Sequence, residues 1–285
     1  MNNNVIEYIE KEIPCLDHGF VRLIDVMGDD AAIVQAARVS YGKGTKSVTE
    51  DRGLIRYLMR HKHTSPFEMV EFKFHVKLPI FIARQWIRHR TANVNEYSGR
   101  YSEMKDEFYL PEKSQLRTQS VVNKQGRSDE KLEDDSVQII YDKLSNSFEE
   151  SYSEYKEFLE LGLAREIARI NLPLSNYTEW YWKIDLHNLF HFLRLRIDKH
   201  AQYEIQVYGN AIAEIVKKAV PLAWEAFEDY ILNSSYFSSI ENKVLAELID
   251  YSKLPSVDDL VQKGISKREA IELIDKLNLM KSNVT

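Results

Sequence analysis

Residues 71–90 read EFKFHVKLPIFIARQWIRHR and contain the clearest strand signal in the chain. The first half alternates charged residues or histidine with apolar ones, namely Phe72, Phe74, Val76 and Leu78. This alternation is typical of a half-buried antiparallel strand. Residues 80–90 follow Pro79 with a helical pattern, so the stretch predicts a strand, a turn at proline and a helix whose C-terminus carries Arg88-His89-Arg90.

Other elements are predicted from apolar periodicity, helix caps and prolines. Residues 21–26 form a short apolar strand, and residues 61–68 form a loop because Pro66 disfavours helix in its predecessor. Pro173 and Pro221 end helices. The predicted helices are residues 30–40, 51–60, 137–161, 164–171, 186–199 and 201–220.

Residues 112–137 are polar and lack apolar periodicity, so we expect a long mobile loop. Long insertions of this kind often act as lids or binding loops. A surface loop without a role fits the composition equally well.

The composition is that of a soluble globular protein, with 44% hydrophobic and 29% charged residues in 285. A net charge of −6 argues against a dedicated nucleic-acid or membrane-surface binder. No apolar run reaches the roughly 20 residues that cross a bilayer, and no signal peptide is recognisable, so we expect a cytoplasmic protein. Cys15 is the single cysteine and has no activating neighbour, which argues against thiol chemistry.

The last fifty residues form a predicted helical extension, giving a catalytic domain at residues 1–235 and an appendage at 236–285. Ser256 with Asp259 and Ser266 with Glu269 are capping-box patterns on either side of Gly264. A helix-turn-helix DNA reader is conceivable, but seven Lys and Arg against eight Asp and Glu is a poor balance for binding phosphates. Packing or partner contact is favoured.

An anion site is predicted where Arg88-His89-Arg90 is followed by Ser98 and Arg100-Tyr101. Guanidinium groups pair bidentately with phosphate oxygens, and an acidic protein does not gather cations by general bias. Arg196 lies at the edge of the apolar stripe of its predicted helix. An arginine there needs a buried carboxylate or a ligand.

Several motifs leave alternatives open. His187 and His191 have the spacing of two metal ligands on a helix, but no third ligand completes the motif. Arg165 and Arg169 could form a solvated face. Ser98 is more readily a ligand-positioning hydroxyl than a nucleophile, since no His–Asp pair is evident. No glycine-rich phosphate loop of Rossmann or P-loop type occurs.

The run from Arg88 to Tyr101 resembles the signature of the flavin-dependent thymidylate synthases, the thymidylate synthase-complementing family. The resemblance covers about residues 18–230 in the family's order. The matching segments are Gly19–Val21, Ala36–Ser40, His63–Glu68, Pro79–Trp86, Glu166–Arg169 and Leu195 to Glu204.

The resemblance implies reductive methylation of dUMP to dTMP, with 5,10-methylenetetrahydrofolate as carbon donor, FAD as hydride carrier, NADPH as reductant and no cysteine nucleophile. It implies dUMP contacts from Gln85, Trp86, Ile87, Arg88, Ser98, Gly99, Arg100, Arg169 and Arg196. It implies FAD contacts from Ser65, Arg88, His89, Arg90, Glu96, Asp185, Leu186, His187 and His191. By the same resemblance Arg196 stabilises the ionised uracil, and His63 assists folate handling near the flavin. No resident metal is implied.

The family fold is a mixed α+β domain around a mainly antiparallel sheet flanked by helices, assembled as a homotetramer with active sites between subunits. This chain departs from the motif at Asn93, where serine is usual. Asp185, His187 and His191 stand where other branches of the family carry Asn, Arg and Asn. A nucleotide- or RNA-binding module and a histidine metalloenzyme are the competing hypotheses.

Overall fold

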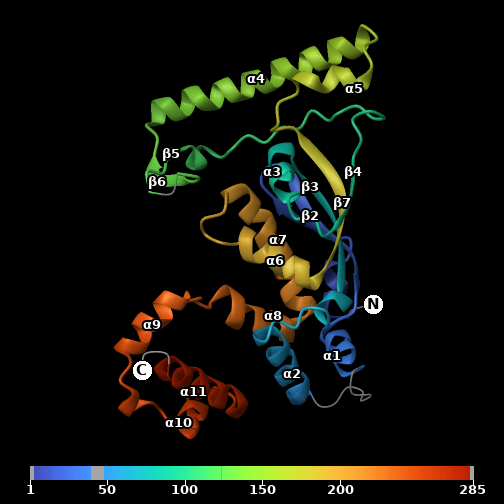
Figure 1. The fold of residues 1–285 in the computed structure, drawn as a ribbon. Coiled ribbons are helices and arrows are strands. Elements are labelled where there is room, and N and C mark those ends of the chain that lie inside the picture. Colours follow the sequence, from blue (N-terminus) through green and yellow to red (C-terminus); the bar gives the residue numbers. More distant parts are fainter. Residues whose placement is uncertain (1–2, 40–47, 123, 283–285) are drawn as a thin grey trace. The chain divides into compact units, whose positions relative to one another are not determined.

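Five strands form one sheet in the order β1-β2-β3-β7-β4, and every neighbouring pair is antiparallel. The computed structural model describes residues 3–39, 48–122 and 124–282, and divides the chain into two units, Met1–Leu232 and Asn233–Thr285. The predicted α+β class, with a mainly antiparallel sheet flanked by helices, is confirmed (Figure 1).

The strands are β1 (Glu12–Cys15), β2 (Gly19–Met27), β3 (Glu71–Pro79), β4 (Asn93–Glu96), β5 (Arg117–Gln119), β6 (Arg127–Lys131) and β7 (Tyr177–Asp185). The helices of the first unit are α1 (Asp30–Arg38), α2 (Val48–Arg60), α3 (Ile80–Trp86), α4 (Asp134–Glu160), α5 (Arg165–Ala168), α6 (Leu186–Arg196), α7 (Tyr203–Ala219) and α8 (Pro221–Phe227). Short 3-10 turns cover η1 (Asn3–Tyr8), η3 (Phe67–Met69), η4 (Lys113–Gln115) and η5 (Arg169–Asn171), and a π turn forms η6 (Glu228–Leu232).

One face of the sheet carries the main core, and α6 and α7 lie on one side of the sheet (Figure 1). The alternation predicted for residues 72–78 is confirmed, because all four apolar side chains of that stretch are fully buried in β3. β7 contributes a second row, made of Trp180, Trp182 and Ile184. Burying each such side chain is worth about 1.5–3 kcal/mol, so these rows fix which face of the sheet points inward.

The most important element missing from the sequence prediction is β7, the strand between β3 and β4. Its sequence, YTEWYWKID, alternates aromatic or apolar residues with polar ones as clearly as β3 does. In the register Phe74 lies opposite Trp182, and Asp185 ends the strand directly before α6. β7, which was not predicted from the sequence, therefore determines where α6 begins relative to the sheet.

The helix predicted for residues 80–90 is too long. α3 ends at Trp86, and Arg88-His89-Arg90 lies in the turn beyond its C-terminus. The chain turns there because residues 93–96 leave the helix direction to pair with β7 as an edge strand, with Asn95 opposite Tyr181. Arg88, His89 and Arg90 therefore lie in a turn between two elements that are both packed against the sheet.

The long mobile loop predicted for residues 112–137 is wrong. This segment contains η4, the hairpin of β5 and β6, and the first turn of α4. Arg127 of the hairpin forms an ion pair with Glu204 of α7, in which Nη2 contacts both carboxylate oxygens at 2.6 and 2.7 Å, and Tyr109 donates to the same carboxylate. The Glu204 side chain is almost completely buried. The polar hairpin is ordered because the buried salt bridge between Arg127 and Glu204 holds it to α7. Apolar side chains usually provide such a contact.

Smaller boundary differences follow local chemistry. α2 begins before the predicted residue 51, α6 ends at Arg196 instead of residue 199, and the helix predicted to reach Ser40 ends at Arg38; Ser40 itself lies outside the described residues. The short helix predicted at residues 164–171 is α5 followed by η5. Pro221 does not merely end a helix, since it is the first residue of α8, a position where its missing N–H costs nothing.

The second unit, Asn233–Thr285, contains α9 (Ser239–Leu248), η7 (Tyr251–Lys253), α10 (Val257–Gln262) and α11 (Lys267–Ser282). Both predicted capping boxes are confirmed by hydrogen bonds, since Ser256 and Ser266 accept from the backbone of Asp259 and Glu269. Ser238 and Glu241 form a third at the start of α9.

The Arg127–Glu204 pair yields a stability prediction. Arg127→Met leaves the buried Glu204 carboxylate with only the Tyr109 hydroxyl, and we expect the free energy of unfolding to fall by about 3 kcal/mol. Arg117→Met, in the facing strand, is the matched control: its partner Asp129 is fully exposed at 3.6 Å, and a change below about 1 kcal/mol is expected. Urea denaturation of both variants measures the difference, and equal losses would contradict a buried anchor.

Candidate active site

The start of α6 is fixed by the end of β7. Asp185 caps the helix by accepting from the Asn188 backbone N–H at 2.9 Å, and the Asn188 side-chain amide donates to the second carboxylate oxygen at 2.7 Å. A cap of this kind stabilises a helix by about 1 kcal/mol. Because strand and cap are both fixed, the direction of the helix that carries His191 and Arg196 is defined.

A cavity of about 480 Å³ lies where this helix meets the turn after α3. Its lining residues come from both segments and from the last part of β7: Arg88, His89, Arg90, Thr91, Ile184, Asn188, His191, Leu195 and Arg196. The volume falls in the usual range of small-molecule sites. Two stretches that are a hundred residues apart in sequence, and that sequence analysis had singled out separately, thus line one cavity.

Among the described residues, no ion pair joins the cavity's arginines, Arg88, Arg90 and Arg196, to an acidic side chain. Within this described part of the chain, the polar partner of Arg196 is His89, whose Nε2 accepts from the Arg196 Nε–H at 3.1 Å. Of the two possibilities raised by the position of Arg196, a buried carboxylate or a ligand, the geometry favours a ligand.

Burial alters the acid–base properties of this cluster. Desolvation, followed by the charges of Arg196 and His191, lowers the pKa of His89 to about 4. Desolvation, followed by Arg194, His187 and Arg196, also lowers the pKa of His191. Burial alone lowers the pKa of the Arg196 guanidinium, which nevertheless stays charged at any physiological pH. Both imidazoles are therefore neutral at pH 7, and the positive charge resides on the arginines.

A second group of predicted residues gathers elsewhere. Gly99 lies against Arg169, because a Cβ on Gly99 would be 3.1 Å from two atoms of that side chain. Arg100 pairs with Glu166 at 3.2 Å, and the Ser98 hydroxyl accepts from the Arg100 backbone N–H at 3.4 Å. None of these residues lines the first cavity. The predicted site is therefore divided within one chain.

The remaining predicted residues have varied surroundings. Gln85 is hydrogen-bonded to Gln202, and Glu96 accepts from Thr178 at 2.8 Å. His63 and Ser65 are exposed near the end of α2, where the His63 ring lies 5.9 Å from that of Tyr57. Ile87 is exposed and His187 is half-buried, whereas Leu186 is fully buried.

Trp86 is also fully buried. Its ring contacts an aromatic cluster, with centroid distances of 5.8 Å to Trp180, 5.1 Å to Trp182, 4.7 Å to Phe192 and 6.0 Å to Tyr208. The Trp86 side chain therefore serves the core, and only its backbone is available to a ligand.

Sequence reasoning missed four cavity residues: Thr91, Ile184, Asn188 and Leu195. The missed strand β7 accounts for Ile184. Asn188 had a usable signal, because it lies three residues before His191 on the same helix face.

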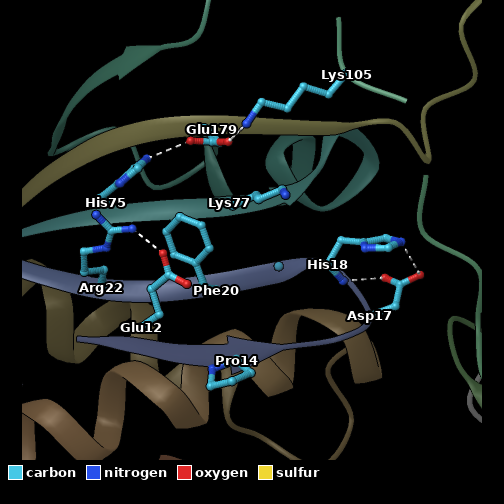
Figure 2. Close-up of a pocket in the computed structure, with 11 residues that line it drawn as sticks. Glu12, Pro14, Asp17, His18, Phe20, Arg22, His75, Lys77, Lys105 and Glu179 are labelled. Atoms are coloured by element: carbon cyan, nitrogen blue, oxygen red, sulfur yellow. Dashed lines mark hydrogen bonds and ion pairs between the residues drawn. The ribbon is translucent and has the colours of Figure 1, made fainter. Parts of the chain in front are cut away.

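A second cavity, of about 450 Å³, lies on the sheet face formed by β1, β2, β3 and β7 (Figure 2). Its charged groups are already paired: Arg22 with Glu12, Lys105 with Glu179 at 2.7 Å, His75 with Glu179 at 3.0 Å, and Lys77 with Glu107 at 2.8 Å. It contains no residue of the predicted site. The contrast marks the first cavity as the better anion site, because its cations are not neutralised.

Among the described residues, no cluster of three or more histidine, cysteine, aspartate or glutamate side chains is placed to hold a metal ion. Nor does any described helix have the length and apolar character needed to span a bilayer.

Residues 22–222 match the family model described as thymidylate synthase complementing protein. The chain belongs to this family. Flavin-dependent thymidylate synthases from Wolbachia pipientis and Thermus thermophilus are each 56% identical to it, over 96% and 92% of this chain and 94% and 95% of their own.

Solved structures agree with this family assignment. A UMP/dUMP methylase, PolB, from Streptomyces cacaoi was crystallised with 5-Br dUMP and with 5-Br UMP. The two structures have TM-scores of 0.70 and 0.69 and sequence identities of 34% and 35%. Each covers 78% of this chain, and the chain covers 100% and 99% of theirs.

The difference between the two cavities is testable with pyrophosphate, a simple polyanion. In this member of the thymidylate synthase complementing family, freed of bound small molecules, Arg90→Gln should weaken pyrophosphate binding about tenfold, because one charge-assisted contact is lost. Arg22→Gln, in the cavity with paired charges, is the control and should leave affinity unchanged. Titration calorimetry decides, and an equal loss in both variants would contradict the assignment of the first cavity as the anion site.

Proposed function

We propose that this protein methylates dUMP at C5 of the uracil to give dTMP, with 5,10-methylenetetrahydrofolate as carbon donor, FAD as hydride carrier and NADPH as reductant. The observation that carries the proposal is a cavity lined by Arg88, Arg90 and Arg196, none of which has a carboxylate partner among the described residues. The names of the relatives and the pyrimidine nucleotides bound by PolB support the same reaction.

The cavity's chemistry suits a flavin dinucleotide. Arg88 and Arg90 provide charge for a pyrophosphate, while Ile184 and Leu195 provide apolar wall. By resemblance the holding residues are Ser65, Arg88, His89, Arg90, Glu96, Asp185, Leu186, His187 and His191. When bound, FAD supplies hydride transfer that no side chain can perform. The protein contributes binding, orientation and charge.

In this proposal the nucleotide substrate is bound mainly by arginines, one of which, Arg88, is shared with FAD. Gln85, Arg88, Ser98, Gly99, Arg100 and Arg169 bind dUMP in this proposal, together with the backbone of Trp86 and Ile87. Arg196 lies against the pyrimidine, where it stabilises negative charge on the uracil and so strengthens C5 as a nucleophile. A half-buried guanidinium suits that role because its field is poorly screened. His63 is assigned to folate handling.

Cys15 supports a mechanism without a cysteine nucleophile. It is the chain's single cysteine, it lies in β1 and is 1% exposed. Burial raises the pKa of its thiol to about 12. A thiol that is neither accessible nor ionised is a poor nucleophile.

We further propose a homotetramer whose active sites lie between subunits. The two groups of predicted residues line different places on one chain, which is what a site completed by a neighbouring copy requires. Close to Arg169, the segment from α4 to β7 leaves apolar side chains exposed at Leu161, Leu163, Ile167, Ile170 and Leu174. Covering such a patch favours association.

The reaction is tested first. Purified protein is expected to show flavin absorbance bands and to release tritium from C5-labelled dUMP only when both folate and NADPH are present. Arg196→Ala should keep the flavin bands but lose turnover about a hundredfold or more, because it removes charge stabilisation on the pyrimidine. Nucleotide binding without tritium release would favour a binding module, and activity that needs added zinc or manganese would favour a metalloenzyme.

The shared site is tested by mixing inactive chains. Arg196→Ala and Arg169→Ala are each expected to be inactive alone. Co-expressed, they should recover about a quarter of wild-type turnover, because random assembly pairs a wild-type Arg196 with a neighbour's wild-type Arg169 in one site out of four. Activity that stays at the level of the single variants would show that both arginines act within one chain.

A further inference from the structure

The hydrogen bond between Arg196 and His89 is unusual because its acceptor is an imidazole and not a carboxylate. Arginine side chains in proteins are normally neutralised by carboxylates or phosphates, yet here the partner of the Arg196 Nε–H is an imidazole nitrogen at 3.1 Å. Arginine has donors only, so His89 Nε2 must be the acceptor and its proton must lie on Nδ1. The hydrogen bond therefore fixes both the tautomer of His89 and one edge of the guanidinium.

His89 is suited to accept this bond at neutral pH. Burial and the neighbouring positive charges keep the imidazole unprotonated. His191 faces it from α6 with a ring-centroid distance of 5.6 Å, and Arg88 and Arg90 flank it in the turn. A protonated imidazole has no lone pair to offer and would repel the guanidinium.

The ring of His89 is held in place by the aromatic core. Phe192 contacts it edge to face at 5.0 Å, and Phe192 in turn lies 4.7 Å from Trp86. A continuous chain of packed rings thus runs from the sheet to the imidazole. Because interiors are densely packed, the ring has little freedom to swing away from Arg196.

The hydrogen bond uses the Nε–H donor of the Arg196 guanidinium and does not involve the N–H donors of its two Nη groups. Within the described part of the chain, no hydrogen bond or ion pair is formed by the Nη groups of Arg196. These groups form the forked end that binds planar acceptors bidentately. Held at Nε by a neutral group, the fork keeps its full charge, whereas a carboxylate at the same place would cancel it.

We propose that His89 is a positioning residue for Arg196, accepting the Nε–H hydrogen bond so that the guanidinium presents both Nη groups, at full charge, to the ligand. The inference rests on the proposed function in one respect, because that function places the pyrimidine against Arg196. It adds a role for His89 that differs from contact with the cofactor, since the imidazole acts through the arginine.

The bond itself is tested without any assay of turnover. In a nitrogen-15 spectrum of the holoenzyme, the Arg196 Nε–H signal is identified as the one lost in Arg196→Lys. It should exchange slowly with solvent in the wild type and in His89→Gln, whose amide oxygen reaches a place similar to Nε2. His89→Phe should speed its exchange at least tenfold. Equal exchange in wild type and His89→Phe would overturn the proposal whatever reaction the protein performs.

A double-mutant cycle then tests the consequence for the substrate. His89→Phe should raise the dissociation constant of dUMP and lower kcat/KM about ten- to hundredfold, while His89→Gln should recover most of both. In an Arg196→Lys background, which keeps the charge but lacks Nε–H, His89→Phe should add less than about threefold.

The alternatives give different outcomes in the same cycle. One alternative outcome is that His89→Phe reduces dUMP affinity and kcat/KM as strongly in the Arg196→Lys background as in the wild type, with less flavin retained. That result would overturn the proposal and would indicate that His89 contacts the cofactor directly. His18→Gln, an exposed histidine of the second cavity, is the control and should leave all values unchanged. Failure of the proposed function alone would leave the wild type inactive with dUMP while the exchange difference persisted.

Discussion

The packing of Trp86 is the constraint on which the rest of the site depends. Its ring lies where β7, α6 and α7 meet, in contact with Trp180, Trp182, Phe192 and Tyr208. A fully buried indole at the last residue of α3 fixes where that helix ends. The arginine turn begins two residues later, so its direction is set by the core and not by its own sequence. The same aromatic cluster orients α6. The two walls of the cavity, the arginine turn and α6, are therefore both positioned by the packing around Trp86.

The distribution of charge is the second organising feature. On the open sheet face, cations and carboxylates neutralise one another, as ordinary surface networks do (Figure 2). In the cavity beside α6, three arginines line one space and have no acidic partner among the described residues. Repulsion between like charges makes that arrangement costly in the free protein, and partial burial adds a desolvation cost for Arg196. A polyanionic ligand relieves both costs at once, so binding and folding stability are coupled, and the ligand-bound protein should be the more stable form.

Sequence reasoning predicted the parts of this structure that depend on local pattern. The alternation in β3, the helix at α6 and the capping boxes of the second unit are each specified by a few neighbouring residues. It did not predict the elements whose formation depends on contacts with distant parts of the chain. β4 has no apolar alternation and forms because β7 offers it a partner, and the β5–β6 hairpin is ordered by Glu204, some seventy residues away. The motif residues were found from the sequence, but their division between two places on one chain was not visible there, because it depends on the path of the chain after Trp86.

The state of Cys15 has a consequence for the chemical robustness of the protein. Buried in β1 and held as a neutral thiol, it offers neither access nor thiolate to peroxides, disulfides or alkylating agents. Since it is the chain's sole cysteine, the folded protein exposes no sulfhydryl to oxidation. Reagents that modify accessible thiols are therefore expected to leave the folded protein unchanged.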